Sequence, residues 1–117
     1  MPEQVDPATL EAWLADDEER DTLVLDVRTP PEYDLGHLPG AANVPLAGLP
    51  SAISDLDIPE RVVFVCEVGT ASEQAGRLLE SSERVDEDTA VYNLAGGMRE
   101  WDGPVTRDSH TEAHDET

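Results

Sequence analysis

The hydrophobic residues of this chain gather in three short runs that are rich in β-branched side chains. The runs cover residues 22–28, 62–65 and 89–94, and segments with helical spacing lie between them. Unbroken apolar runs of this length are typical of strands covered on both faces, as in a parallel sheet. The pattern therefore predicts an α/β fold built on a parallel sheet.

Three other segments have apolar residues at the spacing of one helix face. They contain Leu10, Trp13 and Leu14; Leu46, Leu49, Ile53 and Leu56; and Ala71, Ala75, Leu78 and Leu79. Asp6 can cap the first helix, and Pro7 suits its first position. A short strand is expected at residues 42–44, and the two glycines in residues 95–101 should form a turn that opens a short helix.

The only cysteine of the chain, Cys66, directly follows the apolar run at residues 62–65. Gly69 and hydroxylic residues come next, and then the helical pattern begins, so Cys66 should lie on a tight turn beside a helix N-terminus. Unpaired N–H groups and partial positive charge gather there and favour the thiolate, which is the nucleophilic form. The alternative is that Cys66 is a buried, inert residue that ends a strand.

Two further polar residues, Asp26 and Arg28, end the run at residues 22–28 and should lie on the same ligand-binding edge of the sheet. They could brace loops through charge-assisted hydrogen bonds or contact a substrate directly, and Arg28 could pair with Glu32. His37 could act as a general base or order its loop by a hydrogen bond. No Ser or Cys lies next to His37 in the sequence, which favours the second role.

The chain is strongly acidic, with 27 Asp and Glu residues against seven Arg, no Lys and a formal net charge of −20. Such a surface suits molar salt, where the Debye length falls to about 3 Å and self-repulsion is screened. An ordinary acidic protein is the alternative to this halophilic interpretation. An acidic surface repels phosphates and anionic lipids, so we expect no nucleic acid and no membrane as partners.

At 117 residues the chain should form one domain, which we place at residues 1–103, followed by a disordered acidic tail at residues 104–117. No apolar run approaches the ~20 residues of a membrane span, no signal-peptide pattern is present, and one cysteine cannot form an internal disulfide. We therefore expect a cytoplasmic protein. The acidic residues 16–19 should form a solvated loop, and His110 and His114 lack an ordered helix on which to share a metal.

Four stretches carry a resemblance to a known family. They are residues 25–28 (LDVR), residues 32–45 (EYDLGHLPGAANVP), the strand that ends at Cys66, and residues 94–98 (LAGGM) with Trp101. From about residue 4 to residue 103 the chain resembles the single-domain rhodanese family of sulfurtransferases. The resemblance implies a parallel sheet flanked by helices on both faces, with Cys66 cycling through a persulfide without a metal or organic cofactor.

The active-site loop implied by the resemblance consists of Glu67, Val68, Gly69, Thr70, Ala71 and Ser72. Gly69 matches the family's loop glycine, and Ser72 matches the serine after the loop. The family pattern Cys-Arg-x-Gly-x-Arg-Ser has arginines where this chain has Glu67 and Ala71. The loop keeps the short length that suits sulfur, whereas the related phosphatases have a longer loop that admits phosphate.

Replacing a loop arginine by Glu67 should disfavour both a thiolate and an anionic donor. The penalty is about 1 kcal/mol at 4 Å in water and about 4 kcal/mol at an effective dielectric constant of 20. A helix terminus returns about 0.3–1 kcal/mol, and up to about 2 kcal/mol where it is partly buried. Salt should screen the Glu67 charge more than it weakens the contacts of the loop N–H groups, so sulfur transfer should accelerate with salt.

The implied activity is a rhodanese-type sulfurtransferase. Cys66 would accept a sulfane sulfur from thiosulfate or, more readily, from a persulfide donor, and pass it to a thiol, cyanide or protein acceptor. The alternative is a rhodanese fold used as a low-turnover sulfur carrier or protein-docking module, which the missing arginines favour. Phosphatase and arsenate-reductase chemistry fit poorly, because the loop has no cation for an oxyanion.

Overall fold

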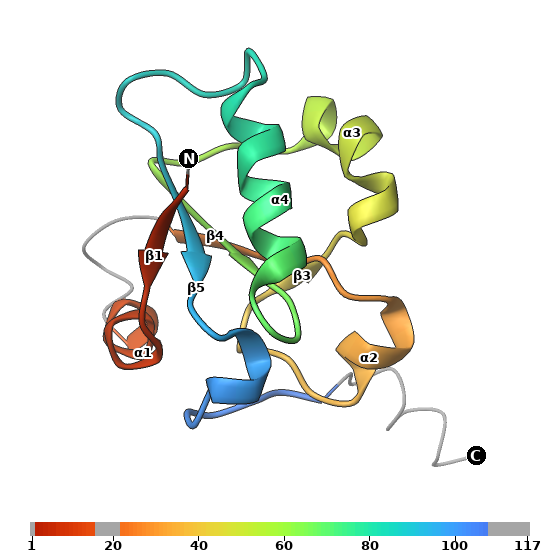
Figure 1. Cartoon of the computed structure of the whole chain (residues 1–117), viewed down its shortest axis with the longest axis vertical. Coiled ribbons are helices and arrows are strands. Elements are labelled where there is room, and N and C mark those ends of the chain that lie inside the picture. Colours follow the sequence, from red (N-terminus) through yellow and green to blue (C-terminus); the bar gives the residue numbers. More distant parts are fainter. Residues whose placement is uncertain (1, 16–21, 108–117) are drawn as a thin grey trace.

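A computed structural model of the chain describes residues 2–15 and 22–107 (Figure 1). Five parallel strands form one sheet in the order β1-β5-β4-β2-β3. Their bounds are Glu3–Val5 for β1, Thr22–Asp26 for β2, Ala42–Asn43 for β3, Arg61–Val65 for β4 and Ala90–Leu94 for β5. The three apolar runs form the three central strands as predicted. The edge strand β1 was not predicted, because its first two residues are polar and exposed.

The helices are α1 (Pro7–Ala15), α2 (Pro30–Asp34), α3 (Leu49–Ala52) and α4 (Thr70–Glu80), with 3₁₀ turns η1 (Leu46–Gly48), η2 (Ile53–Asp55) and η3 (Gly97–Glu100). The single helix expected over residues 46–56 is in fact the series η1, α3 and η2. Gly48 and Pro50 explain the difference, since glycine weakens a continuous helix and proline lacks the N–H that one requires. The predicted core positions Leu49 and Ile53 are nevertheless buried.

The sheet has a separate apolar core on each face. Val62 and Phe64 of β4 pack with residues of α3 and α4, whereas Val63 and Val65 pack with α1 and Trp101. Figure 1 shows α3 and α4 on one side of the strands and α1 on the other. Alternate side chains of one strand therefore enter opposite cores, which is why its sequence is uniformly apolar.

Helix α1 begins as predicted. The Thr9 N–H donates to Asp6 Oδ1 at 2.8 Å, and Pro7 is the first helical residue. Hydrogen bonds from the Thr9 side chain and main chain lower the pKa of Asp6. Across residues 2–15 and 22–107, every helix is too short or too polar to cross a membrane.

The contacts of the domain continue beyond residue 103. Trp101 Nε1 donates to the Pro104 carbonyl at 2.9 Å. His37 and Thr106 exchange two main-chain hydrogen bonds, of 2.9 and 2.7 Å. Residues 104–107, which the sequence had assigned to the tail, are therefore attached to the domain. The rest of that segment, with His110 and His114, and the acidic residues 16–19 lie outside the described residues.

The Leu79 side chain of α4 is fully buried in the apolar core on that face of the sheet. Leu79→Ala should lower the free energy of unfolding by about 2–5 kcal/mol, because it removes apolar contacts and leaves a cavity. Leu35→Ala is the matched control, since Leu35 is 74% exposed, and it should change stability by less than about 0.5 kcal/mol. Urea denaturation measures both variants, and equal effects would contradict this assignment of the core.

Candidate active site

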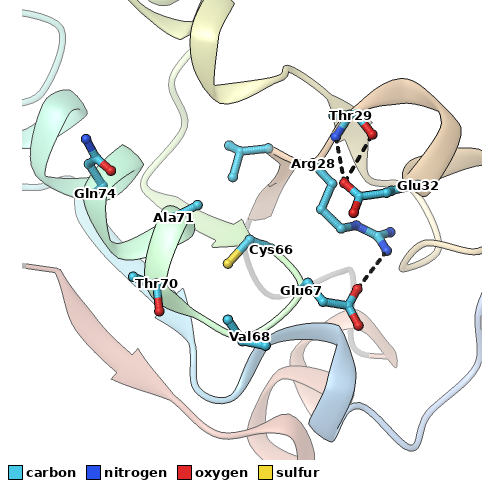
Figure 2. A pocket seen from close by; sticks show the side chains of 10 residues that line it. Arg28, Thr29, Glu32, Cys66, Glu67, Val68, Thr70, Ala71 and Gln74 are labelled. Atoms are coloured by element: carbon cyan, nitrogen blue, oxygen red, sulfur yellow. Dashed lines mark hydrogen bonds and ion pairs between the residues drawn. The ribbon is translucent and has the colours of Figure 1, made fainter.

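A pocket of about 380 Å³ opens at the carboxyl ends of β2 and β4. Parallel pairing brings these ends together, and the Val27 N–H extends the contact by donating to the Val65 carbonyl at 2.9 Å. Figure 2 shows the residues that line the pocket, which are Val27, Arg28, Thr29, Glu32, Cys66, Glu67, Val68, Thr70, Ala71 and Gln74. The sheet edge thus brings together the candidate nucleophile, most of its loop and Arg28.

Cys66 lies in this pocket with only 4% of its surface exposed. The Gly69 N–H donates to Cys66 Sγ at 3.0 Å, and Ser72 Oγ lies 3.3 Å from the same sulfur. Gly69 adopts φ +97°, a left-handed conformation that favours glycine, and α4 begins at the next residue. The loop therefore turns back on itself and aims a main-chain donor at the sulfur.

A second turn holds the main chain of the Cys66 loop in place. The Met98 N–H donates to the Cys66 carbonyl at 2.8 Å, and the Arg99 N–H donates to the Glu67 carbonyl at 3.0 Å. In a trans peptide the C=O and the following N–H point in opposite directions. The N–H groups of Glu67 and Val68 are therefore turned away from residues 97–99.

Gly97 makes this close approach feasible. It adopts φ +65°, and a Cβ atom there would lie 2.5 Å from the Cys66 carbonyl oxygen and 2.6 Å from that of Glu67. The sequence had suggested only that Gly96 and Gly97 open a short helix. Their added role as the support of the Cys66 loop depends on a contact between residues about 30 positions apart in the sequence.

A buried polar chain leads from the sulfur to the edge of the sheet. The Ser72 hydroxyl donates to Asn93 Oδ1, and Asn93 Nδ2 donates to Gln4 Oε1 at 2.9 Å. Ser72 has a single hydroxyl proton, and here Asn93 receives it, so Ser72 acts as an acceptor toward the Cys66 thiol. Sequence reasoning did not select Asn93 or Gln4, although a polar residue inside the apolar run at residues 89–94 was the available sign.

Arg28 and Asp26 form a buried ion pair at the end of β2. Arg28 Nε lies 3.0 and 3.1 Å from the two oxygens of Asp26, and Nη2 lies 2.8 Å from Oδ2. Arg28 Nη2 also donates to the Gly36 carbonyl at 2.8 Å, while Asp26 is fully buried. Burial lowers the pKa of Arg28, but the hydrogen bonds and charge of Asp26, with the charges of Glu67 and Glu32, raise it overall.

The third guanidinium nitrogen of Arg28 faces the loop, with Nη1 3.6 Å from Glu67 Oε1. The pocket therefore contains a cation, Arg28, at the sheet edge where the sequence predicts it, although the loop after Cys66 supplies none. The anticipated pairing of Arg28 with Glu32 is not the dominant contact. Glu32 Oε1 instead accepts hydrogen bonds from the N–H and hydroxyl of Thr29 at 3.1 Å each and so caps α2.

His37 lies outside the residues that line the pocket. It is 5% exposed and stacks on Tyr33, with ring centroids 3.7 Å apart, and its Nδ1 lies 2.9 Å from the Tyr33 carbonyl oxygen. This arrangement suits the loop-ordering role. Within the described ranges, no group of three His, Cys, Asp or Glu residues is arranged to hold a metal ion.

Comparisons with known proteins give the same family as the motifs. The model of the Rhodanese-like domain matches residues 6–103. A sulfurtransferase of Allochromatium vinosum is 34% identical over 101 residues, covering 86% of this chain and 89% of that protein. The chain belongs to the rhodanese-like domain family, which confirms the resemblance and the fold class.

Three other proteins are similar to this chain. Bacillus subtilis YrkF, named as a candidate sulfur carrier, is 30% identical over 87 residues, covering 74% of this chain but 45% of that protein. Bacillus subtilis YqhL is 33% identical over 86 residues, covering 74% of this chain and 65% of that protein. The structure of the human single-domain sulfurtransferase TSTD1 superposes with a TM-score of 0.71 at 28% identity, covering 86% of this chain and 96% of that one.

Gly97→Ala tests the support of the loop. An alanine at this positive φ should cost about 1–3 kcal/mol before any clash, and the Cβ contacts with the Cys66 and Glu67 carbonyl oxygens should add to that. Gly48→Ala is the control, because Gly48 has φ −97° and open space around its Cβ position. It should be neutral or stabilising by about 0.4–1 kcal/mol.

Thermal unfolding gives the stability of both variants, and the amide resonance of Gly69 gives the state of the loop. We expect that resonance to move in Gly97→Ala and to stay unchanged in Gly48→Ala. An unperturbed Gly69 amide in a destabilised Gly97→Ala protein would show that the turn does not position the loop.

Proposed function

We propose that this protein is a sulfurtransferase that moves a sulfane sulfur through a persulfide on Cys66. The observation that carries the proposal is the Gly69 N–H donated to Cys66 Sγ at 3.0 Å inside an accessible pocket. A donor held at contact distance stabilises negative charge on the thiolate. A buried structural cysteine requires neither that donor nor the pocket.

The reaction balances in two steps. The Cys66 thiolate attacks the outer sulfur of the donor, whose S–S bond breaks and releases a thiolate, or sulfite when thiosulfate is the donor. A nucleophilic acceptor then attacks the outer sulfur of Cys66–S–S⁻, and the Cys66 thiolate is the leaving group. The loop N–H groups stabilise the outer sulfur between the two steps.

The proposed donors are thiosulfate and persulfides, and the proposed acceptors are thiols, cyanide and protein sulfur acceptors. Thiosulfate should be the weaker donor, because Asp26, Arg28 and Glu67 together carry a net negative charge beside Cys66. A sulfur carrier with little turnover is the second candidate, favoured by the similarity to YrkF. We place the reaction in the cytoplasm, where a reducing environment keeps the thiol available, and the acidic surface argues against nucleic acid and membrane partners.

Intact-mass spectrometry tests the persulfide. After exposure to a persulfide donor, the protein should gain the mass of one sulfur atom, and Cys66→Ser should not. Adding cyanide or a dithiol should then remove that sulfur over many turnovers. An adduct that forms but is not passed on would identify the carrier. A wild-type protein that takes up no sulfur from any donor would refute both candidates.

The charge of −20 leads to a proposal about salt. We propose that the protein is adapted to high ionic strength, where repulsion among its carboxylates is screened. The melting temperature should rise from dilute buffer to molar KCl. The rate of sulfur transfer should also rise, because the Glu67 side chain is 48% exposed and salt screens its charge.

The two salt effects are separated by measuring rates below the melting transition at every KCl concentration. A melting temperature that does not rise would refute the adaptation. A transfer rate that falls steadily with KCl, in a protein that remains folded, would refute the inhibitory effect of Glu67.

A further inference from the structure

The three guanidinium nitrogens of Arg28 differ in how tightly their partners hold them. Nε and Nη2 are committed to Asp26 and the Gly36 carbonyl at 2.8–3.1 Å, inside the domain. Nη1 instead faces Glu67 Oε1 across 3.6 Å at the pocket wall (Figure 2). One nitrogen of a buried, permanently charged guanidinium is thus directed at the site where a donor would bind.

The carboxylate that meets Nη1 is held only weakly. The Glu67 side chain is 48% exposed, whereas that of Asp26 is 0% exposed. A separation of 3.6 Å also exceeds the roughly 2.7–2.9 Å of a strong charge-assisted hydrogen bond. Ion pairs with exposed partners contribute little to stability. Glu67 can therefore leave Arg28 at small cost, while Asp26 cannot.

We propose that Glu67 occupies an anion subsite formed by Arg28 and thereby selects the sulfur donor. This inference rests on the proposed function and names the substrate class of the same site. Glu67 excludes small dianionic donors, of which thiosulfate is the example. It admits organic persulfides with an uncharged tail, which can lie against the apolar side chains of Val27, Val68 and Ala71.

The selectivity follows from where each donor carries its charge. In thiosulfate the charged oxygens lie two bonds from the sulfane sulfur, on the adjacent sulfur atom, so attack by Cys66 brings them beside Glu67. In an alkyl persulfide the single negative charge is on the outer sulfur, which the loop N–H groups receive, and the tail adds none. Repulsion by Glu67 and the masking of Arg28 therefore both act mainly against thiosulfate.

Glu67→Gln should unmask Arg28 and relax the selectivity. At constant ionic strength we expect the ratio of kcat/KM for thiosulfate to kcat/KM for an alkyl persulfide to rise about tenfold or more; easier ionisation of the Cys66 thiol raises both values alike and cancels in this ratio. Glu73→Gln is the matched control. It removes the same charge from the neighbouring depression on α4, where Glu73 pairs with Arg77 at 3.5 Å. This control should change both values slightly and equally.

A binding experiment separates this inference from the proposed function. In a Cys66→Ser background no sulfur can be transferred, so thiosulfate binding is measured directly by NMR titration. Adding Glu67→Gln should tighten binding about tenfold or more, and thiosulfate should then shift the side-chain Nε–H resonance of Arg28. Adding Glu73→Gln should do neither.

The outcomes are distinct. Equal effects of Glu67→Gln and Glu73→Gln would show that only net charge matters and would overturn the inference. Tighter binding without a shift of the Arg28 resonance would overturn the assignment of the subsite to Arg28. If binding tightens as expected while the protein with Cys66 takes up no sulfur from any donor, the anion subsite stands and the proposed sulfurtransferase activity falls.

Discussion

The candidate site depends on the contact between two tight turns. Residues 97–99 pack against the Cys66 loop closely enough for the Met98 and Arg99 N–H groups to bind the carbonyls of Cys66 and Glu67. Those bonds occupy the carbonyl oxygens of Cys66 and Glu67. The N–H groups of the loop are left for other partners, and that of Gly69 donates to Cys66 Sγ. A residue with a side chain at position 97 would separate the turns. The close packing of two main chains therefore determines the electrostatics around the thiol.

A second constraint is the buried ion pair of Asp26 and Arg28. Because Asp26 has no access to solvent, it requires Arg28, and Arg28 is held with one nitrogen facing the pocket. A residue that braces the loops thus also supplies a charge to the site. The two roles considered for Arg28 are not exclusive. The Glu67 carboxylate faces Nη1 of Arg28, on the side of the guanidinium away from Asp26. The two carboxylates and the one guanidinium together carry a net negative charge.

Membership of the rhodanese-like domain family does not determine the balance of charges at this site. Where the family pattern has two loop arginines, this chain has Glu67 and Ala71. The Gly69 N–H donates to Cys66 Sγ, and the cation that faces Glu67 is Arg28, which follows the strand β2. The two proposed functions, sulfur transfer and sulfur carriage, would use the same persulfide. They differ in how readily the outer sulfur leaves, which depends on how strongly the loop donors hold it.

Sequence alone identified the central strands, the capped first helix and the position of Cys66, because periodicity, capping and turn chemistry are local properties. The edge strand β1 was not predicted, because the formation of a short strand with polar residues depends on its pairing with β5. The Arg28–Glu67 pair, the support from Gly97 and the chain from Ser72 through Asn93 to Gln4 were decided only by the tertiary structure. Each joins residues that are distant in sequence, and packing alone brings them into contact.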